Sequence, residues 1–285
     1  MMSQTREQRK EIKHFAYDIK GLNEDRVYKE NVVAFIQDIP KTAKANFEYA
    51  FLEILNNAIE HSNGTRVTVQ ITRDECMLSF AIMDDGVGIF TKIAETLKLD
   101  EKRYAILELA KGKFTSDPDS HSGEGIFFSS KCGDYFAIES DGVSFIAEST
   151  EEVLHEPTNR PNDPGTCVYF KIKLSHQQTL GELFKQYTNA PERYGFSKTA
   201  IPIRLLEFGD ESPIFISRSQ ARRLLVRVER FEVVQLDFSG VDSIGQGFAD
   251  EIFRVFKTKH PDVKLIPVNC TDAVNQMIQH ALEYR

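Results

Sequence analysis

Three polar side chains interrupt an otherwise apolar segment, and their types could bind a cation or activate a water molecule. Glu53, Asn57 and Glu60 stand at positions i, i+4 and i+7, which in a helix lie within about 60° of one another. A carboxylate and an amide oxygen one turn apart can share Mg²⁺ with phosphate oxygens, and the carboxylate can orient or deprotonate a hydroxyl. A solvated helix face is the ordinary alternative, and the spacing alone does not decide.

The predicted helix that would position these side chains is apolar on most of its surface. Its large apolar residues follow the helical period, and they are Phe47, Phe51, Leu52, Leu55 and Ile59. We expect this helix to span about residues 43–61 and to end at Ser62-Asn63-Gly64, with Gly64 in the C-terminal capping role. If the helix is buried on both sides, its polar residues line a site.

A second candidate site follows the next two predicted strands, at residues 67–71 and 76–83. The second strand ends in Asp84-Asp85-Gly86-Val87-Gly88. A carboxylate at the end of a strand can accept a hydrogen bond from an exocyclic amine such as that of adenine, and glycines let a ligand approach the backbone. An ordinary turn is the alternative, because Asp-Gly is common in turns.

Two further loops could contact a ligand. Residues 122–125, Ser-Gly-Glu-Gly, precede a predicted helix, and the N–H groups of a helix start can bind phosphate. Lys111 and Lys113 stand at the start of the polar loop over residues 111–125 that contains this motif. They could bring positive charge to a phosphate, or they are solvated loop lysines. The second of these loops is Asp163-Pro164-Gly165-Thr166, which leads into a predicted strand at residues 166–174. An ordinary Pro-Gly turn is the alternative.

Composition limits the classes of function. The 285 residues favour two domains. With 35 Lys and Arg against 43 Asp and Glu, the net charge of -8 argues against broad binding of nucleic acid or anionic membrane. No run approaches the ~20 apolar residues of a membrane span, and no apolar signal segment follows the charged start. We therefore expect a cytoplasmic protein whose four cysteines are free thiols.

The order of predicted elements divides the chain. We expect a charged segment with helical content over residues 1–30, a first domain over 31–175, a mostly helical linker over 176–199 and a second domain over 200–285. The first domain would begin with a helix at about 28–39 and contain another over 91–110, with later strands near 135–140 and 143–149. In the second domain, strands at 201–206, 233–238 and 263–268 alternate with helices, which predicts a small α/β domain with helices against one sheet.

The four motifs occur in order between Glu53 and Thr166, and in this order the chain resembles the histidine-kinase-like (GHKL) ATP-binding superfamily. Sensor kinases, gyrases, heat-shock chaperone ATPases, mismatch-repair ATPases and anti-sigma kinases share that superfamily. The resemblance covers roughly residues 28–174. It implies a Bergerat-type ATP-binding fold, an α+β two-layer sandwich, which takes ATP and Mg²⁺ as cofactors.

The resemblance also implies roles for the motif residues. Glu53 would act as the catalytic group that polarises a water or acceptor hydroxyl, Asn57 would ligand Mg²⁺, and Asp84 would hold the adenine amino group. The remaining implied nucleotide contacts are Gly86 and Gly88 at the adenine end, Gly123 and Gly125 at the phosphates, and Thr166 beside the adenine.

One position departs from the sensor-kinase pattern. Many sensor kinases carry Lys or Arg three residues after the motif Asn, where this chain has Glu60. The Glu60-His61 ending is more similar to the anti-sigma kinases.

Residues 201–284 resemble STAS-like domains of the anti-sigma-antagonist type, because the strand with Asp237-Phe238-Ser239-Gly240-Val241 leads into a loop and a helix. In partner-switching antagonists this loop carries a phosphorylated Ser. Here Gln246 and Gly247 take the aligned positions, and the nearby Ser239 and Ser243 are expected to be turn or capping hydroxyls.

The two resemblances together imply a regulatory protein that binds ATP and Mg²⁺. It would be a signalling or partner-switching regulator with ATPase or Ser/Thr kinase activity, in which nucleotide orders the loop at 111–125 toward a protein partner or its own STAS-like domain. The sequence permits a homodimer. The alternative is a non-catalytic, nucleotide-gated interaction module. A histidine kinase is disfavoured, because the upstream His14 lacks the acidic neighbour and downstream Pro of a phosphoacceptor helix.

Overall fold

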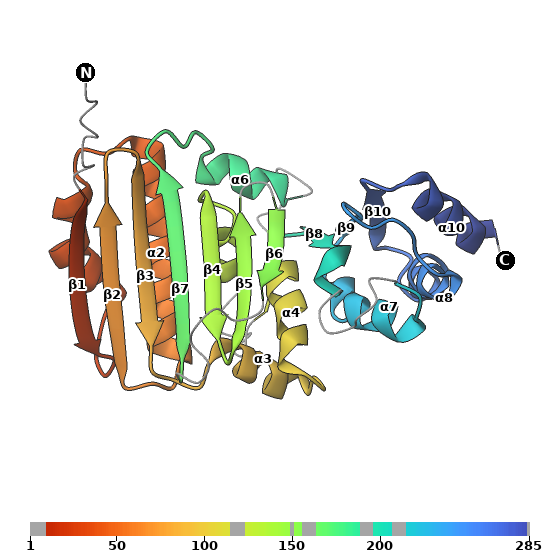
Figure 1. The fold of residues 1–285 in the computed structure, drawn as a ribbon, viewed down its shortest axis with the longest axis horizontal. Helices are drawn as coiled ribbons and strands as arrows, with labels where there is room; N and C mark the ends of the chain where they lie inside the picture. The colour runs from red at the N-terminus through yellow and green to blue at the C-terminus, as the bar shows by residue number, and fades with distance from the viewer. Residues whose placement is uncertain are drawn as a thin grey trace, which may run out of the picture. The chain divides into compact units, whose positions relative to one another are not determined.

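The computed structural model describes residues 10–114, 123–148, 151–155, 164–188, 196–206 and 215–283. The chain forms two compact units (Figure 1). The first comprises Met1–Leu97 and Gly125–Leu183, and the second comprises Lys98–Glu124 and Phe184–Arg285. A segment from the middle of the chain therefore belongs to the same unit as the C-terminal part. The linear domain limits expected from the sequence stay predictions.

The first unit contains a seven-stranded sheet in which every neighbouring pair is antiparallel. In spatial order its strands are β1 (Glu11–Asp18), β2 (Arg66–Arg73), β3 (Met77–Asp84), β7 (Thr166–Lys173), β4 (Tyr135–Ser140), β5 (Val143–Glu148) and β6 (Glu151–His155). Because β7 pairs between β3 and β4, the chain that follows residue 165 returns to the middle of the sheet (Figure 1).

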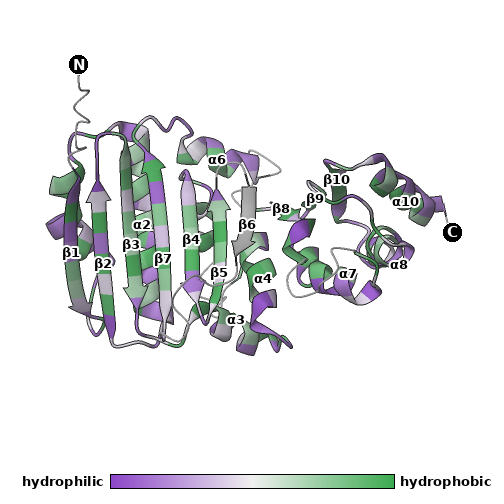
Figure 2. Cartoon of the chain, viewed as in Figure 1, coloured by the Kyte–Doolittle hydropathy of each residue, from purple (hydrophilic) through white to green (hydrophobic). Residues whose placement is uncertain are grey.

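Helix α2 (Lys41–His61) covers one face of this sheet against β3 and β7. Its buried Phe47 meets Phe80 edge-on at 5.4 Å between ring centroids, and Phe80 stacks on Phe170 at 5.2 Å. Burying such aromatic side chains contributes about 1.5–3 kcal/mol each. The opposite residues of each strand are more polar, and Figure 2 shows this alternation as bands along β2, β3 and β7.

Shorter helices complete the first unit. They are α1 (Glu24–Val27) with a π-helical turn (Tyr28–Val32) and a 3-10 turn (Val33–Ile36), then α3 (Ile89–Leu97), α5 (Gly125–Ser129) and α6 (Leu180–Gln186), whose last turn passes into the second unit.

The second unit contains a parallel three-stranded sheet in the order β10 (Lys264–Val268), β9 (Val233–Asp237) and β8 (Lys198–Pro202). Helix α4 (Ala105–Lys111) packs on β8. The other helices are α7 (Arg218–Leu225), α8 (Gln246–Ala249), which continues through a π-helical stretch (Asp250–Phe256) into α9 (Lys257–Lys259), and α10 (Asp272–Glu283). Short 3-10 helices lie at Lys102–Tyr104, Ile203–Leu206 and Val228–Arg230.

The predicted fold class is confirmed: an α+β two-layer sandwich is followed by a small α/β unit. Several predicted features differ in detail. The helix expected at about 28–39 is a π-helical turn followed by a 3-10 turn that ends at Ile36. The helix expected over 91–110 is two helices, because Lys98 has φ +52 and leaves the helical region. The strand expected at 201–206 lies at Lys198–Pro202 and is followed by a 3-10 helix. Asn63, at φ +55, takes the left-handed position after α2 in place of Gly64.

Both edge strands of the large sheet differ from the sequence prediction. Helical content was expected in the first thirty residues, but Glu11–Asp18 form β1. β6 lies between the strands expected near 143–149 and 166–174, where no strand was predicted. In β1 no side chain is fully buried, and Ile12 is 47% exposed. An edge strand with one neighbour therefore shows little of the apolar alternation that reveals a strand.

Among the described residues, no helix is both long enough and apolar enough to cross a membrane.

Candidate functional site

The carboxylate of Asp84 is buried at the end of β3. Its side chain accepts hydrogen bonds at Oδ1 from the backbone N–H of Gly86 at 2.9 Å and of Thr166 at 3.3 Å. Among the described residues no Lys or Arg pairs with it, and burial raises its pKa. A buried carboxylate held only by neutral N–H groups can still accept a hydrogen bond from a ligand.

The first residues of β7 lie against the end of β3, so the structure brings Asp84 and Thr166 together. The Thr166 hydroxyl accepts a hydrogen bond from the N–H of Ile89 at 3.0 Å. Gly165 has φ +97, and a Cβ added there would lie 2.0 Å from the carbonyl oxygen of Asp84. Only glycine permits this approach of the two backbones.

The two glycines after Asp84 are packed against the protein on the side where a Cβ would be. A Cβ on Gly86 would lie 2.1 Å from the carbonyl oxygen of Ser62 at the end of α2, and that oxygen also accepts from Val87 N–H at 2.8 Å. A Cβ on Gly88, at φ +91, would lie 2.5 Å from Asp141 Oδ2. Internal packing therefore requires both glycines, and their contact with a nucleotide stays a prediction.

The neighbouring Asp85 has a different role. Its Oδ1 accepts from the N–H groups of Thr65 and Arg66 at 2.7 and 2.9 Å, and its Oδ2 accepts from the Thr65 hydroxyl at 2.7 Å. The Arg66 N–H and the two Thr65 donors lower the pKa of Asp85 to about 2. Asp85 thus holds the start of β2, and Asp84 alone is buried behind the glycine loop.

The predicted catalytic carboxylate and one predicted phosphate-facing glycine are also brought together. Glu53 is half-buried on α2, and Gly125 begins α5; a Cβ on Gly125 would lie 2.0 Å from Glu53 Oε2. Asn57, one turn further along α2, is half-buried, and its side chain has no hydrogen-bond partner among the described residues. Glu60 is exposed and accepts from Asn56 at 3.2 Å, so the predicted polar stripe becomes more exposed toward the end of the helix.

The predicted phosphate-side lysines and Gly123 belong to the second unit. Lys111 is 1% exposed and donates to Glu108 Oε1 at 2.6 Å and to the Val226 carbonyl at 2.8 Å. Lys111 therefore ends α4 in a buried ion pair, and the alternative prediction that it is a solvated loop lysine is wrong. Burial also lowers its pKa.

Lys113 and Gly123 are held by other residues of the second unit. Lys113 Nζ donates to the Arg230 carbonyl at 3.1 Å and lies 4.8 Å from the Phe231 ring centroid, and burial lowers its pKa. Gly123 has φ +70, and a Cβ there would lie 2.3 Å from the Phe114 carbonyl oxygen. The phosphate contacts of both residues stay predictions. Ser122 and Asp163 of the predicted loops lie outside the described residues.

In the STAS-like region, Ser239 has the turn role expected for it. Its hydroxyl donates to Asp237 Oδ1 at 2.7 Å, and its N–H donates to the same oxygen at 2.9 Å. Ser243 is exposed before the helix, and Gln246 begins α8.

Sequence reasoning missed two polar residues, Ser140 and Asp141, at the turn between β4 and β5. They contact the segments around Asp84, at Gly165 and at Gly88 to Thr91. An Asp-Gly pair between two predicted strands is a hairpin signal, and residues 141–142 carry it. It could have located the turn but not its neighbours.

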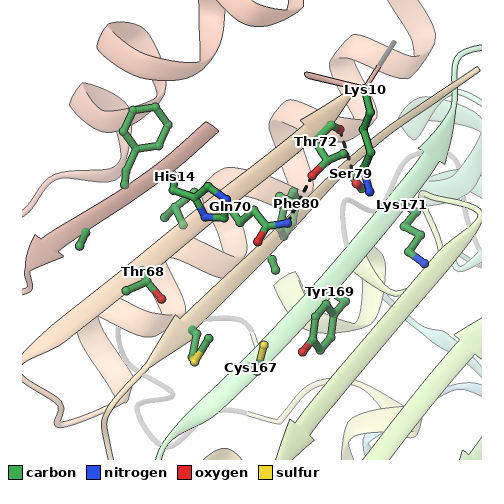
Figure 3. A pocket seen from close by; sticks show the side chains of 15 residues that line it. Lys10, His14, Thr68, Gln70, Thr72, Ser79, Phe80, Cys167, Tyr169 and Lys171 are labelled. Atoms are coloured by element: carbon green, nitrogen blue, oxygen red, sulfur yellow. Dashed lines mark hydrogen bonds between the residues drawn. The ribbon is translucent and has the colours of Figure 1, made fainter. Parts of the chain in front are cut away.

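A separate groove of about 560 Å³ lies over β1, β2, β3 and β7 (Figure 3). Figure 3 shows polar side chains such as Gln70 and Tyr169 along it, with Lys10 and Lys171 also lining it. None of the predicted nucleotide-site residues lines this groove.

The antiparallel sheet with α2 on one face, and the buried carboxylate before a glycine loop, agree with the α+β two-layer fold that the sequence predicts. Residues 43–176 match the family of histidine kinase-, DNA gyrase B-, and HSP90-like ATPases, and residues 220–275 match a STAS-like domain of unknown function. The chain therefore carries a histidine-kinase-like ATPase domain followed by a STAS-like domain. The ATPase domain implies nucleotide binding.

Curated relatives share only part of the chain. The protein called Sensor protein VraS, in each of two strains of Staphylococcus epidermidis, is 35% identical over 94 residues. The match covers 31% of this chain and 27% of that relative's length.

Proposed function

We propose that this chain is an ATP- and Mg²⁺-binding signalling regulator of the partner-switching kind, with ATPase or Ser/Thr kinase activity. The observation that carries the proposal is Asp84. It is 7% exposed, and among the described residues its partners are neutral N–H groups. It lies at the strand end of an ATPase domain that shares its chain with a STAS-like domain. A carboxylate with this environment suits the exocyclic amine of adenine.

The other roles are assigned on α2. We assign to Asn57 the contact with Mg²⁺, because its amide is half-buried and has no partner among the described residues. In the described part of the chain, no three His, Cys, Asp or Glu side chains gather as metal ligands. Asn57 would therefore hold Mg²⁺ jointly with phosphate oxygens and water. When bound, the ion would neutralise phosphate charge, and Glu53 would orient the attacking water or hydroxyl.

A regulator is favoured over a histidine kinase, although the matched relative is named a sensor protein. His14, the candidate phosphoacceptor weighed from the sequence, lies in the edge strand β1. Glu60 also stands where many sensor kinases carry a basic residue. A STAS-like domain in the same chain supplies the type of partner that an anti-sigma kinase acts on, and the partner is either this domain or a separate protein.

Calorimetric titration with ATP and Mg²⁺, followed by a phosphate-release assay on the same sample, tests the proposal. We expect Asp84→Asn to weaken ATP binding at least tenfold, which corresponds to about 1.4 kcal/mol. Glu53→Ala should keep ATP binding and lose phosphate release. Glu60→Ala, an exposed change on the same helix, is the matched control and should alter neither.

Two results would redirect the proposal. Unchanged ATP affinity in Asp84→Asn would show that the pocket is wrongly assigned. ATP binding by the unmodified protein with neither phosphate release nor transfer to a Ser or Thr would leave the non-catalytic, nucleotide-gated interaction module as the function.

A further inference from the structure

The turn between β4 and β5 has a conformation that its sequence enforces. Asp141 and Gly142 have φ +56 and +73, and they join Ser140 to its paired residue Val143. A two-residue turn with both residues left-handed strongly favours Asp-Gly. The side chains of Ser140 and Asp141 are therefore presented at a fixed place at the end of these strands.

Asp141 holds the segment that follows Asp84. Its Oδ2 accepts a hydrogen bond from the N–H of Thr91, the third residue of α3, at 3.1 Å. An N–H in the first turn of a helix has no partner within the helix, so a carboxylate there stabilises the helix start. The same oxygen would lie 2.5 Å from a Cβ added to Gly88. Asp141 thus fixes both the end of the glycine loop and the start of α3.

Ser140 contacts the second backbone segment around Asp84, which is Gly165-Thr166. It is 6% exposed, and its hydroxyl lies 2.8 Å from the Gly165 carbonyl oxygen and 3.1 Å from Asp141 Oδ2. Gly165 precedes Thr166, whose N–H donates to Asp84.

The two segments are also joined directly, since Ile89 N–H donates to the Thr166 hydroxyl. The N–H groups that hold Asp84 Oδ1 come from Gly86 on one segment and Thr166 on the other. Both segments also contact the Ser140–Asp141 turn, which is therefore a second link between the two backbone supports of Asp84.

We propose that Asp141 and Ser140 are positioning residues for base recognition, which fix the two backbone segments around Asp84 and so set where its carboxylate meets the base. This inference rests on the proposed function. Adenine offers an amine to Asp84, whereas guanine offers a carbonyl oxygen at the same place. The preference for ATP over GTP therefore reports how well Asp84 is positioned.

The substitutions separate positioning from packing. Asp141→Ala removes the acceptor for Thr91 N–H, while Asp141→Asn keeps an oxygen that can accept it. Ser140→Ala removes the contact with Gly165. Glu95→Ala changes an exposed residue of α3 and is the matched control.

The experiment measures ATP and GTP affinities by calorimetry, together with the thermal midpoint, for each full-length variant. We expect Asp141→Ala to lower the ATP-over-GTP preference about tenfold and Ser140→Ala to lower it about threefold. Asp141→Asn and Glu95→Ala should keep the preference of the unmodified protein.

The outcomes distinguish this inference from the proposed function. If Asp84→Asn weakens ATP binding but Asp141→Ala and Ser140→Ala keep the preference, the inference is overturned and the nucleotide site stands. A lower thermal midpoint with an unchanged preference also overturns it, because the turn would then be structural only. If Asp141→Ala does not fold, Ser140→Ala decides. If the unmodified protein binds neither nucleotide, the proposed function fails, and the inference fails with it.

Discussion

Two buried carboxylates, one in each unit, are used in opposite ways. Asp84 in the first unit is 7% exposed, and within the part of the chain that the structure describes it accepts only backbone N–H groups. Glu108 in the second unit is 2% exposed and lies 2.6 Å from Lys111 Nζ and 3.5 Å from a guanidinium nitrogen of Arg227. A buried charge that is compensated inside the protein serves structure, whereas one without a cation is available to a ligand.

The ion pairs around Glu108 also explain why Lys98–Glu124 belongs to the second unit. Lys111 donates to the Val226 carbonyl, and the hydroxyl of Thr199 on β8 donates to the Lys111 carbonyl at 2.8 Å. These charges are satisfied only when α4 packs with the C-terminal part of the chain. The matched ATPase family spans residues 43–176, yet α4 belongs structurally to the second unit.

The largest expected effect comes from breaking the compensated pair. Lys111→Met leaves Glu108 buried without its nearest cation, and we expect the second unit to lose about 3–5 kcal/mol of stability. The double variant Glu108→Gln/Lys111→Met should recover part of this loss, because no unpaired carboxylate remains. Denaturant unfolding followed by circular dichroism measures both. A loss under about 1 kcal/mol in Lys111→Met would contradict the structural role of the pair.

A smaller effect should follow from crowding the backbone that supports Asp84. In Gly86→Ala the new Cβ meets the Ser62 carbonyl oxygen, which is backbone and cannot swing away. We expect a loss of about 1–3 kcal/mol in thermal or denaturant unfolding. Gly181→Ala, where nothing lies within 4 Å of the added Cβ, is the matched control. Equal effects of the two substitutions would mean that the glycine loop is not held against α2.

Asp84→Asn should change the free energy of unfolding at neutral pH by about 1 kcal/mol or less, and any change should stabilise the folded protein. The folded pKa of Asp84 is raised above its ordinary value of 3.8, so the folded state retains the proton to a higher pH than the unfolded state. The free energy of unfolding that depends on Asp84 therefore falls as pH rises from about 3.8 through the folded pKa of this carboxyl. The variant should gain stability relative to the unmodified protein over that rise, measured by unfolding at several pH values. A relative loss would reverse the sign and refute the description of Asp84.

Asp85 should show the opposite dependence, with the smallest effect because it is solvent-exposed. Its pKa falls from 3.8 to about 2 in the folded protein, so it contributes stability above pH 3.8 that is lost as pH falls toward 2. Asp85→Asn should flatten the acid side of the stability curve between pH 2 and 4, followed by circular dichroism. An unchanged acid limb would mean that Asp85 does not hold the start of β2.

Much of the fold follows from local patterns. Helix α2 is predicted within two residues at its start because its apolar residues repeat at the helical period, and β2 and β3 are predicted because one face of each is buried. The edge strands β1 and β6 are not predicted, because a strand with one neighbour shows weak alternation. The break at Lys98 is missed because a single left-handed residue leaves no periodic signal.

The sequence by itself determined the order of the motifs, the two fold types and which residues are candidates for chemistry, because each of these depends on spacing along the chain. Only the tertiary structure showed that Asp84 is buried and that Asp85 is exposed, although the two are identical side chains in adjacent positions. It also decided that Lys111 is buried in an ion pair, that α4 belongs to the second unit, and that Ser140 and Asp141 stand beside the glycine loop. Burial and partners come from residues distant in sequence, and no local pattern records them.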